Sequence, residues 1–529
     1  MGDYLNPGNE AFRTICNEIY VDKTGLIAYI NGTINTPRKL TSFSRPRRFG
    51  KSFAAKMLCA YYDRSCDSRA LFEGLEISKA DSYEKYLNQF DVIYLDIVQF
   101  VSNCMDRKNV VKDLQMRVIR ELKMNYPEIA DLEETVLPYV LSAIVAKTNR
   151  KFIIIIDEWD ALFREAKDDL ALQEEYVCLL RGIFKAGPMT DKIIAGAYMT
   201  GILPIKKYGT QSALTDFREF TMIEPFGLSE YVGFTENEVC ALGRVHDLDL
   251  DEMKQWYDGY SFRETQHVYS PNSVMSAVYN RKCRNYWTSS ETYESLKSYI
   301  SQNFDGLKDA VVAMLGGGKI RINTSRFQND MTSFKSRDDI LTLLIHLGYL
   351  AYDESSAKVF IPNLEVAEAF RDAVEGEGWE EIEKALMASE DLLEATIDGA
   401  CSAVEQALED IHEANFSILR YNDENSLSCA ITLAYYTARN YYEIIRELPA
   451  GKGFADLAFL PRKHVDKPAM LVELKYDRDA DSAIRQIKEN HYDGILKKYF
   501  GNLLLVGINY DKEAKGDRKK RHTCVIEKV

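Results

Sequence analysis

The chain has 529 residues, of which 46% are hydrophobic and 28% charged, and its formal net charge is −15. This length is too great for one hydrophobic core, so we expect about three domains. The acidic balance argues against a generally basic protein that coats nucleic acid. No apolar run reaches the roughly 18 residues that a membrane span needs, and the first residues lack the pattern of a secretory signal. We expect a cytoplasmic protein without a membrane segment.

The ten cysteines are scattered through apolar segments, with no C-x-x-C pair and no histidine cluster nearby. This distribution predicts reduced core thiols and argues against a zinc site. Any contact with nucleic-acid phosphates should come from two local basic patches, at Arg45 to Arg48 and at Lys515 to Arg521. The second patch fits a solvated charge run as well as it fits a DNA contact.

The first predicted elements that carry chemistry are a strand, a turn and a helix around Gly50. An apolar strand at Leu40–Phe43 precedes a strong helix pattern that begins near Ser52. This order places backbone N–H groups and the positive end of a helix dipole at one point, where phosphates bind. Lys51 would reach the β- and γ-phosphates, and Ser52 would hold magnesium. The general P-loop pattern has glycine five residues before Gly50, where this chain has Arg45.

A second part of a nucleotide site is predicted after the isoleucine-rich run Phe152–Ile156, which fits a parallel strand buried on both faces. Asp157 falls at its carboxyl end, where ligands bind in open α/β sheets. Asp157 can hold the magnesium ion and Glu158 can polarise a hydrolytic water. A third apolar strand ends near Thr200, which is placed to sense the γ-phosphate. The alternative is that Asp157 and Glu158 form an ordinary strand-end turn.

Eight motifs occur in order between about residues 5 and 285: YVDKT, SRPRRFGKS, IYLDI, IIIDEWDALF, YMTGILPI, GFTENEV, WYDGYSF and VYSPNSV. They resemble the predicted AAA-ATPase-like family of bacteria and archaea. In that family the arginine-rich RPRRFGK form is the usual P-loop, so Arg45 departs only from the general pattern. The resemblance identifies no arginine finger; Arg218 is a weak candidate, for which a surface salt bridge is the preferred alternative. The resemblance implies that Gly50, Lys51 and Ser52 bind ATP, with Asp157 and Glu158 as the second acidic motif. Arg48 and Thr200 complete the ATP and Mg²⁺ site that we predict.

The middle of the chain predicts a winged-helix-like module. A helix pattern from Asp338 is followed by two short strands, Tyr349–Tyr352 and Lys358–Ile361, and by a second helix after Pro362. Such modules either bind DNA or only pack domains together. Acidic side chains on or beside the two helices weigh against DNA binding; they are Asp338, Asp339, Glu365 and Glu368.

The sequence pattern in the last third of the chain predicts a small mixed α/β domain. Helix patterns run from Trp379 to His412 and from Ser426 to about Leu448. Two apolar strands, FADLAFL and AMLVELKYD, come next, followed by a helix from Asp481 to about Lys498 and a strand LLLVGINY.

Each of the two apolar strands carries an acid in an otherwise buried pattern, at Asp456 and Glu473. Glu473 and Lys475 share a face, since residues two apart in a strand point the same way. If the register sets Asp456 beside them, two carboxylates and an ammonium converge on a pocket about one metal ion wide. Two carboxylates and a phosphate oxygen suit Mg²⁺, and Lys475 would orient a water or stabilise negative charge. The alternative is a surface pair of Glu473 and Lys475.

This arrangement resembles the PD-(D/E)XK nuclease superfamily over roughly residues 385 to 529, and in particular the nuclease domain often fused to the AAA-ATPase-like family. The acidic motif is GFAD, which ends at Asp456, and the E-x-K motif is ELK, from Glu473 to Lys475. The resemblance adds Glu424 as a metal-site acid and Gln486 as a helix residue that faces the site. Tyr492 lies six residues further on and would line it.

Together these patterns predict a P-loop AAA-like ATPase domain with its lid at 1–285, a winged-helix-like module at 286–380 and a restriction-endonuclease-like α/β domain at 381–529. We expect an ATP-regulated, magnesium-dependent nuclease that acts on nucleic acid, with DNA as the first candidate. Because similar ATPases commonly assemble as rings, we also expect that the chain can form a homo-oligomer. The alternatives are an ATP-dependent switch or scaffold that binds without cutting, and an ATPase that no longer hydrolyses because Arg45 narrows the phosphate loop.

Overall fold

The computed structural model describes residues 2–104, 107–185, 187–205, 214, 216–287, 293–302, 304–327, 334–375, 378–415, 424–450, 453–463, 465–489, 499, 501–512 and 521–529. The chain forms two compact units. The first comprises Met1–Ser290 and Arg321–Val366, and the second comprises Glu291–Ile320 and Ala367–Val529. In the described part of the chain, no helix combines the length and the apolar character that a bilayer crossing requires. The three domain boundaries proposed from the sequence stay predictions.

The first unit is built on a parallel sheet with strand order β2-β3-β4-β1-β5. Every residue of β3 and of β4 is buried, as expected for strands with helices on both faces. Ser44 at the end of β1 pairs with Gly201 at the end of β4, and Asp96 at the end of β2 pairs with Asp157. The carboxyl ends of these strands therefore meet at one edge. The strands are β1 (Leu40–Ser44), β2 (Asp91–Asp96), β3 (Phe152–Asp157), β4 (Ile194–Gly201) and β5 (Arg218–Phe220).

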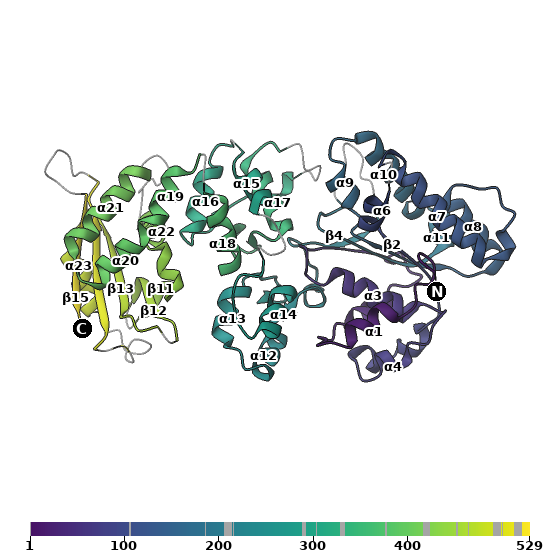
Figure 1. Ribbon diagram of the computed structural model, residues 1–529, viewed down its shortest axis with the longest axis horizontal. Coiled ribbons are helices and arrows are strands. Elements are labelled where there is room, and N and C mark those ends of the chain that lie inside the picture. Colours follow the sequence, from purple (N-terminus) through teal and green to yellow (C-terminus); the bar gives the residue numbers. More distant parts are fainter. Residues whose placement is uncertain are drawn as a thin grey trace. The chain divides into compact units, whose positions relative to one another are not determined.

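Helices cover both faces of this parallel sheet (Figure 1). On one side, α3 contacts β2, β3 and β4. On the other side, Ile154, Ile156 and Met199 form a hydrophobic core with leucines of α7, α8 and α10. The helices are α1 (Glu10–Cys16), α2 (Gly25–Asn31), α3 (Lys51–Tyr62), α4 (Arg69–Phe72), α5 (Tyr83–Tyr86), α6 (Ile97–Asn103), α7 (Val110–Asn125), α8 (Leu137–Thr148), α9 (Ala161–Glu165), α10 (Leu170–Phe184) and α11 (Pro188–Ile193).

The rest of the first unit is mostly helical, with a second small core around Met253, Tyr257 and Val274. The predicted helix, hairpin and helix of the middle module are present as α17, the antiparallel pair β9 and β10, and α18. The winged-helix assignment stays a prediction. The elements are β6 (Phe234–Thr235), α12 (Glu236–Val245), α13 (Leu250–Tyr257), β7 (Val268–Tyr269), α14 (Pro271–Asn280), β8 (Ile320–Arg321), α17 (Arg337–Leu347), β9 (Ala351–Asp353), β10 (Lys358–Phe360) and α18 (Leu364–Ala373); β8 and α18 cross the boundary between the units along the chain.

Two of the acids in the middle module have structural partners. Asp339 forms a capping box with Ser336 at the start of α17, where each residue bonds the other's backbone N–H. The buried Glu365 carboxylate accepts hydrogen bonds from the backbone N–H groups of Tyr286 and Trp287, at 2.6 and 3.2 Å. These two acids therefore stabilise local structure in the first unit.

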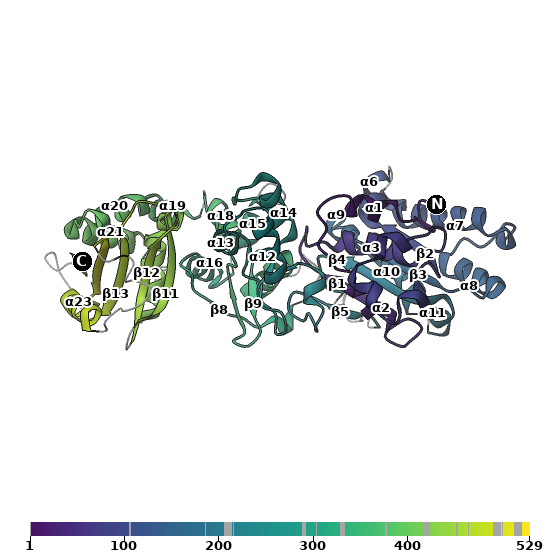
Figure 2. The same cartoon turned by 90° about the horizontal axis from the view of Figure 1, so that it is seen from below.

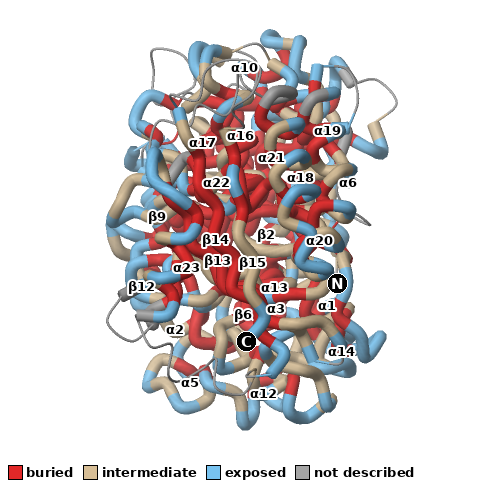
Figure 3. The backbone as a smooth tube through the Cα atoms, turned by 90° about the vertical axis from the view of Figure 1, so that its left-hand side faces the viewer, coloured by how far each residue is buried: buried red, intermediate tan, exposed pale blue. Residues whose placement is uncertain are grey.

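The second unit contains a mixed sheet with strand order β11-β12-β13-β14-β15, in which only β13 and β14 run parallel. Figure 2 shows α20 and α21 on one side of this sheet and α23 on the other, and the tube in Figure 3 shows β13 and β14 as buried. The elements are α15 (Tyr293–Ile300), α16 (Leu307–Leu315), α19 (Glu380–Met387), α20 (Ser389–Ile397), α21 (Cys401–Asn415), α22 (Glu424–Ala434), β11 (Tyr442–Ala450), β12 (Gly453–Pro461), β13 (Ala469–Tyr476), α23 (Ala480–Glu489), β14 (Leu503–Tyr510) and β15 (His522–Lys528).

The helix predicted from Ser426 to about Leu448 is wrong in its second half. Helix α22 ends at Ala434, a short 3₁₀ turn follows, and the remainder is strand β11. That segment is rich in tyrosine and isoleucine, which favour extended backbone, and it pairs with β12 from Tyr442 opposite Pro461 to Ala450 opposite Gly453. The partner strand therefore decides the structure of an apolar run that local periodicity assigns to a helix. Strand β15 was not predicted.

Candidate nucleotide and metal sites

The segment between β1 and α3 forms the predicted turn, because β1 ends at Ser44 and α3 begins at Lys51. Gly50 has φ +90°, and a Cβ atom built there would meet no atom within 4 Å. Exposed Arg48, two residues earlier, also has a left-handed backbone, with φ +63°. The loop thus turns sharply and leaves open space beside Gly50 at the N-terminus of a helix of 12 residues. This geometry fits a phosphate group.

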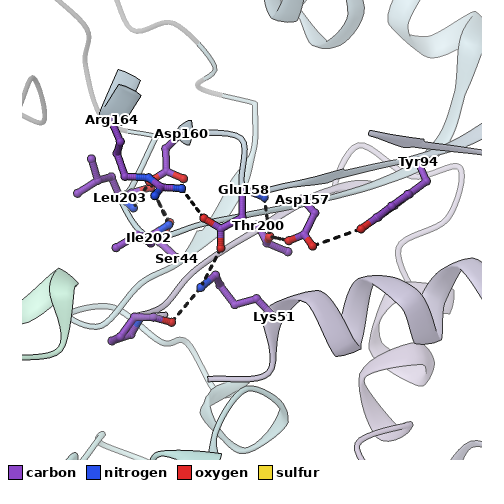
Figure 4. A network of polar contacts seen from close by, with 11 residues as sticks. Ser44, Lys51, Tyr94, Asp157, Glu158, Asp160, Arg164, Thr200, Ile202 and Leu203 are labelled. Carbon is purple, nitrogen blue, oxygen red and sulfur yellow. Dashed lines mark hydrogen bonds and ion pairs between the residues drawn. The ribbon is translucent and has the colours of Figure 1, made fainter. Parts of the chain in front are cut away.

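Lys51 and Glu158 lie together at the carboxyl edge of the parallel sheet (Figure 4). The Lys51 side chain is only 3% exposed; its Nζ donates to the Pro46 carbonyl at 2.9 Å and lies 3.5 Å from Glu158 Oε1. Glu158 Oε2 lies 2.5 Å from Nη2 of Arg164. Glu158 has φ +53°, a strained backbone for a residue that is not glycine. The carboxylate of Glu158 is therefore held between two cations.

Asp157 and Thr200 are hydrogen-bonded to each other. They lie on β3 and β4, and β4 is the neighbour of β1, the strand that leads into the loop before α3. Asp157 is 2% exposed; its Oδ1 accepts a hydrogen bond from Thr200 Oγ1, and its Oδ2 accepts one from the Tyr94 hydroxyl at 3.4 Å. Thr200 Oγ1 also accepts the backbone N–H of Glu158 at 3.2 Å. Thr200, which the sequence places as a γ-phosphate sensor, thus joins the two acids. Ser52 is half-buried in the first turn of α3.

Two residues of this network were not identified from the sequence. Asp160 is fully buried and accepts the backbone N–H groups of Ile202 and Leu203 at 3.1 and 3.0 Å. Arg164 Nε lies 3.4 Å from Asp160 Oδ2 and also binds Glu158. Burial raises the pKa of Asp160, although the charge of Arg164 opposes the shift. The i,i+4 spacing of Asp160 and Arg164 was the available signal.

Arg45, which occupies the first glycine position of the general P-loop pattern, is fully buried. Its guanidinium donates to the carbonyls of Ser44 and Phe220, at 3.2 and 3.3 Å, and lies 5.1 Å from the centre of the Phe262 ring. These contacts fasten β1 to the neighbouring strand β5. Arg218, the weak candidate for an arginine finger, is exposed on β5 with its guanidinium over Phe220.

In the second unit, the candidate metal site lies where two paired strands diverge. The ladder between β12 and β13 continues as far as Leu457 opposite Val472. Beyond it, the backbone N–H of Leu474 donates to Asp456 Oδ2 at 2.7 Å. From Glu473 onward, β13 continues its pairing with β14. We call this divergence the strand fork.

The structure brings Asp456, Glu473 and Lys475 together at the strand fork. Lys475 Nζ donates to Glu473 Oε1 at 2.9 Å, and both side chains are buried. Burial raises the pKa of Glu473; the charge of Asp456 adds to the shift, and Lys475 opposes it. The pair is therefore not the exposed one that the alternative interpretation required.

The donor set at the strand fork fits a divalent cation. Glu473 Oε2 is buried and accepts no hydrogen bond among the described residues. Burying a carboxylate oxygen without a partner costs free energy, and a cation bound between this oxygen and Asp456 would offset that cost. Carboxylate oxygens are the ligands that Mg²⁺ takes in proteins.

The remaining residues predicted for this site are placed only in part. Gln486 is half-buried on α23, which covers the sheet face formed by Leu471 of β13 and Leu505 of β14. Glu473 and Lys475 alternate in phase with Leu471, so they point to this same face. Glu424 begins α22, but its side chain lies outside the described residues, as do Tyr492 and the predicted basic patch from Lys515 except Arg521.

Comparisons with known proteins identify the two regions. Residues 8–210 match the family described as predicted AAA-ATPase, and residues 423–519 match the PD-(D/E)XK nuclease superfamily. An uncharacterized protein in the vnfD 5′ region of Azotobacter chroococcum mcd 1 is 22% identical over 287 residues, which are 54% of this chain and 52% of that protein. The chain thus spans about half the length of this curated relative.

Two solved structures resemble this chain, but with low TM-scores. One is a signal transduction ATPase with numerous domains and a tetratricopeptide repeat sensor from Pyrococcus horikoshii, with 13% identity, a TM-score of 0.26 and coverage of 80% of this chain and 56% of that one. The other is the ORC2 protein of Aeropyrum pernix, with 12% identity, a TM-score of 0.26 and coverage of 66% and 93%. Scores this low carry no argument, so the identification depends on the two family matches. The chain thus contains one region that matches the predicted AAA-ATPase family and a second region that matches the PD-(D/E)XK nuclease superfamily.

Proposed function

We propose that this protein binds and hydrolyses ATP in its first unit and cleaves nucleic-acid phosphodiesters with Mg²⁺ in its second. The observation that carries the nuclease proposal is the meeting of Asp456, Glu473 and Lys475 at the strand fork, with one buried oxygen of Glu473 lacking a hydrogen-bond partner. The family match of residues 423–519 supports it. DNA is our first candidate substrate.

In the proposed cleavage, Asp456 and Glu473 would hold the cation, which when bound would lower the pKa of a water and neutralise charge on the phosphate. Lys475 is fixed by its hydrogen bond to Glu473. From there its ammonium group orients the attacking water and stabilises the negative charge that develops on the phosphate. The hydrogen bond from Leu474 N–H holds the Asp456 carboxylate at the strand fork.

In the proposed ATP site, the loop before α3 receives the phosphates at Gly50 and Lys51 binds the β- and γ-phosphates. Ser52 and Asp157 hold Mg²⁺. Glu158 polarises the attacking water, a role that requires its carboxylate to leave the ion pair with Lys51. Thr200 keeps Asp157 and Glu158 in register through its hydroxyl group.

We further propose that the nucleotide state of the first unit controls cleavage by the second. The support is that both sites belong to one chain. The assay that tests this coupling measures cleavage of plasmid, linear and single-stranded DNA and of RNA, with Mg²⁺ or Mn²⁺, with and without ATP. If cleavage is the same with or without ATP and is unchanged in Lys51→Ala, the two sites are independent.

The same assay tests the nuclease itself through Glu473→Gln and Asp456→Asn. We expect each variant to lose cleavage by at least about 100-fold, because each removes a charged ligand of the cation. Glu443→Gln is the matched control, since Glu443 is exposed on β11, the strand next to β12, which carries Asp456. Cleavage that survives in both site variants would assign the activity to another site or to a contaminant. ATP hydrolysis without any cleavage would favour the switch or scaffold.

A further inference from the structure

A second cluster of metal-binding side chains lies on the other face of the sheet in the second unit. Glu409 and His412 stand three residues apart on α21 and therefore share one face of that helix. His522 begins β15, against which α21 packs. Tyr510, the partner of His522 in the β14–β15 ladder, contacts both histidine rings, with ring centres 5.1 and 5.2 Å away.

The three side chains are close enough to share one ion. One potential ligand atom from each lies within 4.8 Å of those of the other two. Atoms no further apart than this have a common centre within about 2.8 Å of each, whereas zinc bonds to nitrogen and oxygen measure about 2.0–2.2 Å. Two of the side chains are already joined, since His522 Nδ1 lies 2.8 Å from Glu409 Oε2. Shifts of less than an ångström per ligand would bring all three atoms to bonding distance from one ion, with the fourth position left to water.

The chemistry of the cluster suits zinc better than magnesium. Two imidazoles and one carboxylate are a recurring zinc donor set, whereas Mg²⁺ prefers oxygen ligands. Both histidine side chains are buried, with exposures of 1% and 0%.

Arg521 forms an ion pair with Glu409, one of the three side chains of this cluster. Its Nε lies 3.0 Å from Glu409 Oε1, while Oε2 of the same carboxylate faces His522. Arg521 therefore fixes the carboxylate so that one oxygen points to the histidines, as second partners of metal ligands do.

We propose that Glu409, His412 and His522 form a zinc site that fastens α21 to β15. This site is distinct from the strand fork, because Glu473 and Lys475 point to the sheet face covered by α23, whereas Tyr510 and His522 contact α21. The proposal does not rest on the proposed nuclease activity. The sequence argument against zinc considered cysteine pairs and local histidine clusters, and it missed two histidines 110 positions apart in the chain.

The test uses the full chain with Glu473→Gln as the background, which removes one of the two carboxylates at the strand fork and so weakens any metal binding there. After treatment with a chelator, the protein is titrated with Zn²⁺ by calorimetry and with Co²⁺ by visible absorption. We expect one equivalent of each ion to bind, with the visible Co²⁺ absorption of a four-coordinate site. Zn²⁺ should also raise the midpoint of thermal unfolding.

Two variants of the cluster and one control decide the outcome. His412→Phe keeps an aromatic ring between Tyr510 and His522 but removes the ligand, and Glu409→Gln keeps the size of the side chain. Each should weaken Zn²⁺ binding at least tenfold and remove the Co²⁺ bands. His267→Gln, which removes a histidine paired with Asp258 in the first unit, should change neither. The proposal is overturned if the background protein takes up no Zn²⁺, or if both cluster variants bind it as the background protein does.

Discussion

Arg164 and Glu158 form a partly buried ion pair at 2.5 Å beside the loop before α3, and the same guanidinium lies 3.4 Å from the fully buried carboxylate of Asp160. Lys51 lies on the other side of Glu158, at 3.5 Å. Two cations and two acids thus form one charge-balanced cluster, in which Arg164 contacts both Glu158 and Asp160. Removing Arg164 would leave Asp160 buried without its cation.

We therefore expect Arg164→Ala to lower the free energy of unfolding by about 3 kcal/mol, since breaking a buried pair leaves an uncompensated charge. Urea denaturation measures this change. Arg117→Ala is the control, because Arg117 pairs with Asp113 on the surface of α7 with 49% of its side chain exposed. Its loss should change the free energy of unfolding little, because the pair is exposed to solvent. Equal effects of the two substitutions would contradict the structural role of Arg164.

Asp160 makes the stability of the protein depend on pH in a defined direction. Burial raises its pKa above the ordinary value of 3.8. A carboxyl group of this kind stabilises the folded state below its unfolded pKa, and the contribution is lost as the pH rises through the folded value. Asp160→Asn cannot ionise. The stability of this variant relative to the natural protein should therefore increase as the pH rises above 3.8, the ordinary pKa of the group.

The stability of Asp191→Asn should depend on pH in the direction opposite to that of Asp160→Asn. The hydrogen bond from Lys39 lowers the pKa of Asp191, so its contribution is present above 3.8 and is lost as the pH falls. The stability of this variant relative to the natural protein should decrease as the pH rises through the range below 3.8. Urea titrations at a series of pH values measure both slopes. Slopes of the same sign would disprove the assignment for Asp160.

Gly50→Ala should separate backbone strain from nucleotide binding. Gly50 and Gly74 have φ of +90° and +84°, and neither has an atom within 4 Å of a built Cβ. Alanine at either position should cost about 1–2 kcal/mol, because the left-handed conformation is strained for it. Only Gly50→Ala should also weaken ATP binding, since only that backbone lines the phosphate loop. Titration with a fluorescent ATP analogue compares the two variants, and equal affinities would remove Gly50 from the site.

Lys475→Met should destabilise the metal-free protein and be rescued by a divalent cation. The ammonium of Lys475 is the only cation that the described contacts give to the buried Glu473 carboxylate, so its loss should cost about 3 kcal/mol. Mg²⁺ or Mn²⁺ at the strand fork would restore a positive charge next to Glu473. The midpoint of thermal unfolding, with and without the metal, measures both effects.

Lys488→Met is the matched control for this rescue, because Lys488 pairs with Glu527 while 53% of its side chain is exposed. It should be close to neutral and should respond to metal as the natural protein does. A Lys475→Met variant that is destabilised and gains nothing from the cation would argue against metal binding at the strand fork.

The parts of the sites that depend on local patterns could be predicted from the sequence. The isoleucine run before Asp157 sets the end of a buried strand, and the two-residue period of β13 puts Glu473 and Lys475 on one face. Contacts between distant segments could not be predicted. The pairing of β11 with β12 overrides a helical pattern, and His522 reaches Glu409 across 113 positions. The packing of Arg45 against Phe262 likewise depends on tertiary structure.

An inactive form made to trap bound nucleic acid must keep an oxygen at position 456. The Asp456 carboxylate accepts the N–H of Leu474, the residue between Glu473 and Lys475. Alanine would leave that donor without its acceptor, at a cost of about 1–3 kcal/mol, and would release the backbone that carries both other site residues. Asparagine retains a carbonyl oxygen for the same bond and removes only the charge. A complex trapped with Asp456→Asn would therefore preserve the shape of the strand fork, whereas one trapped with Asp456→Ala would not.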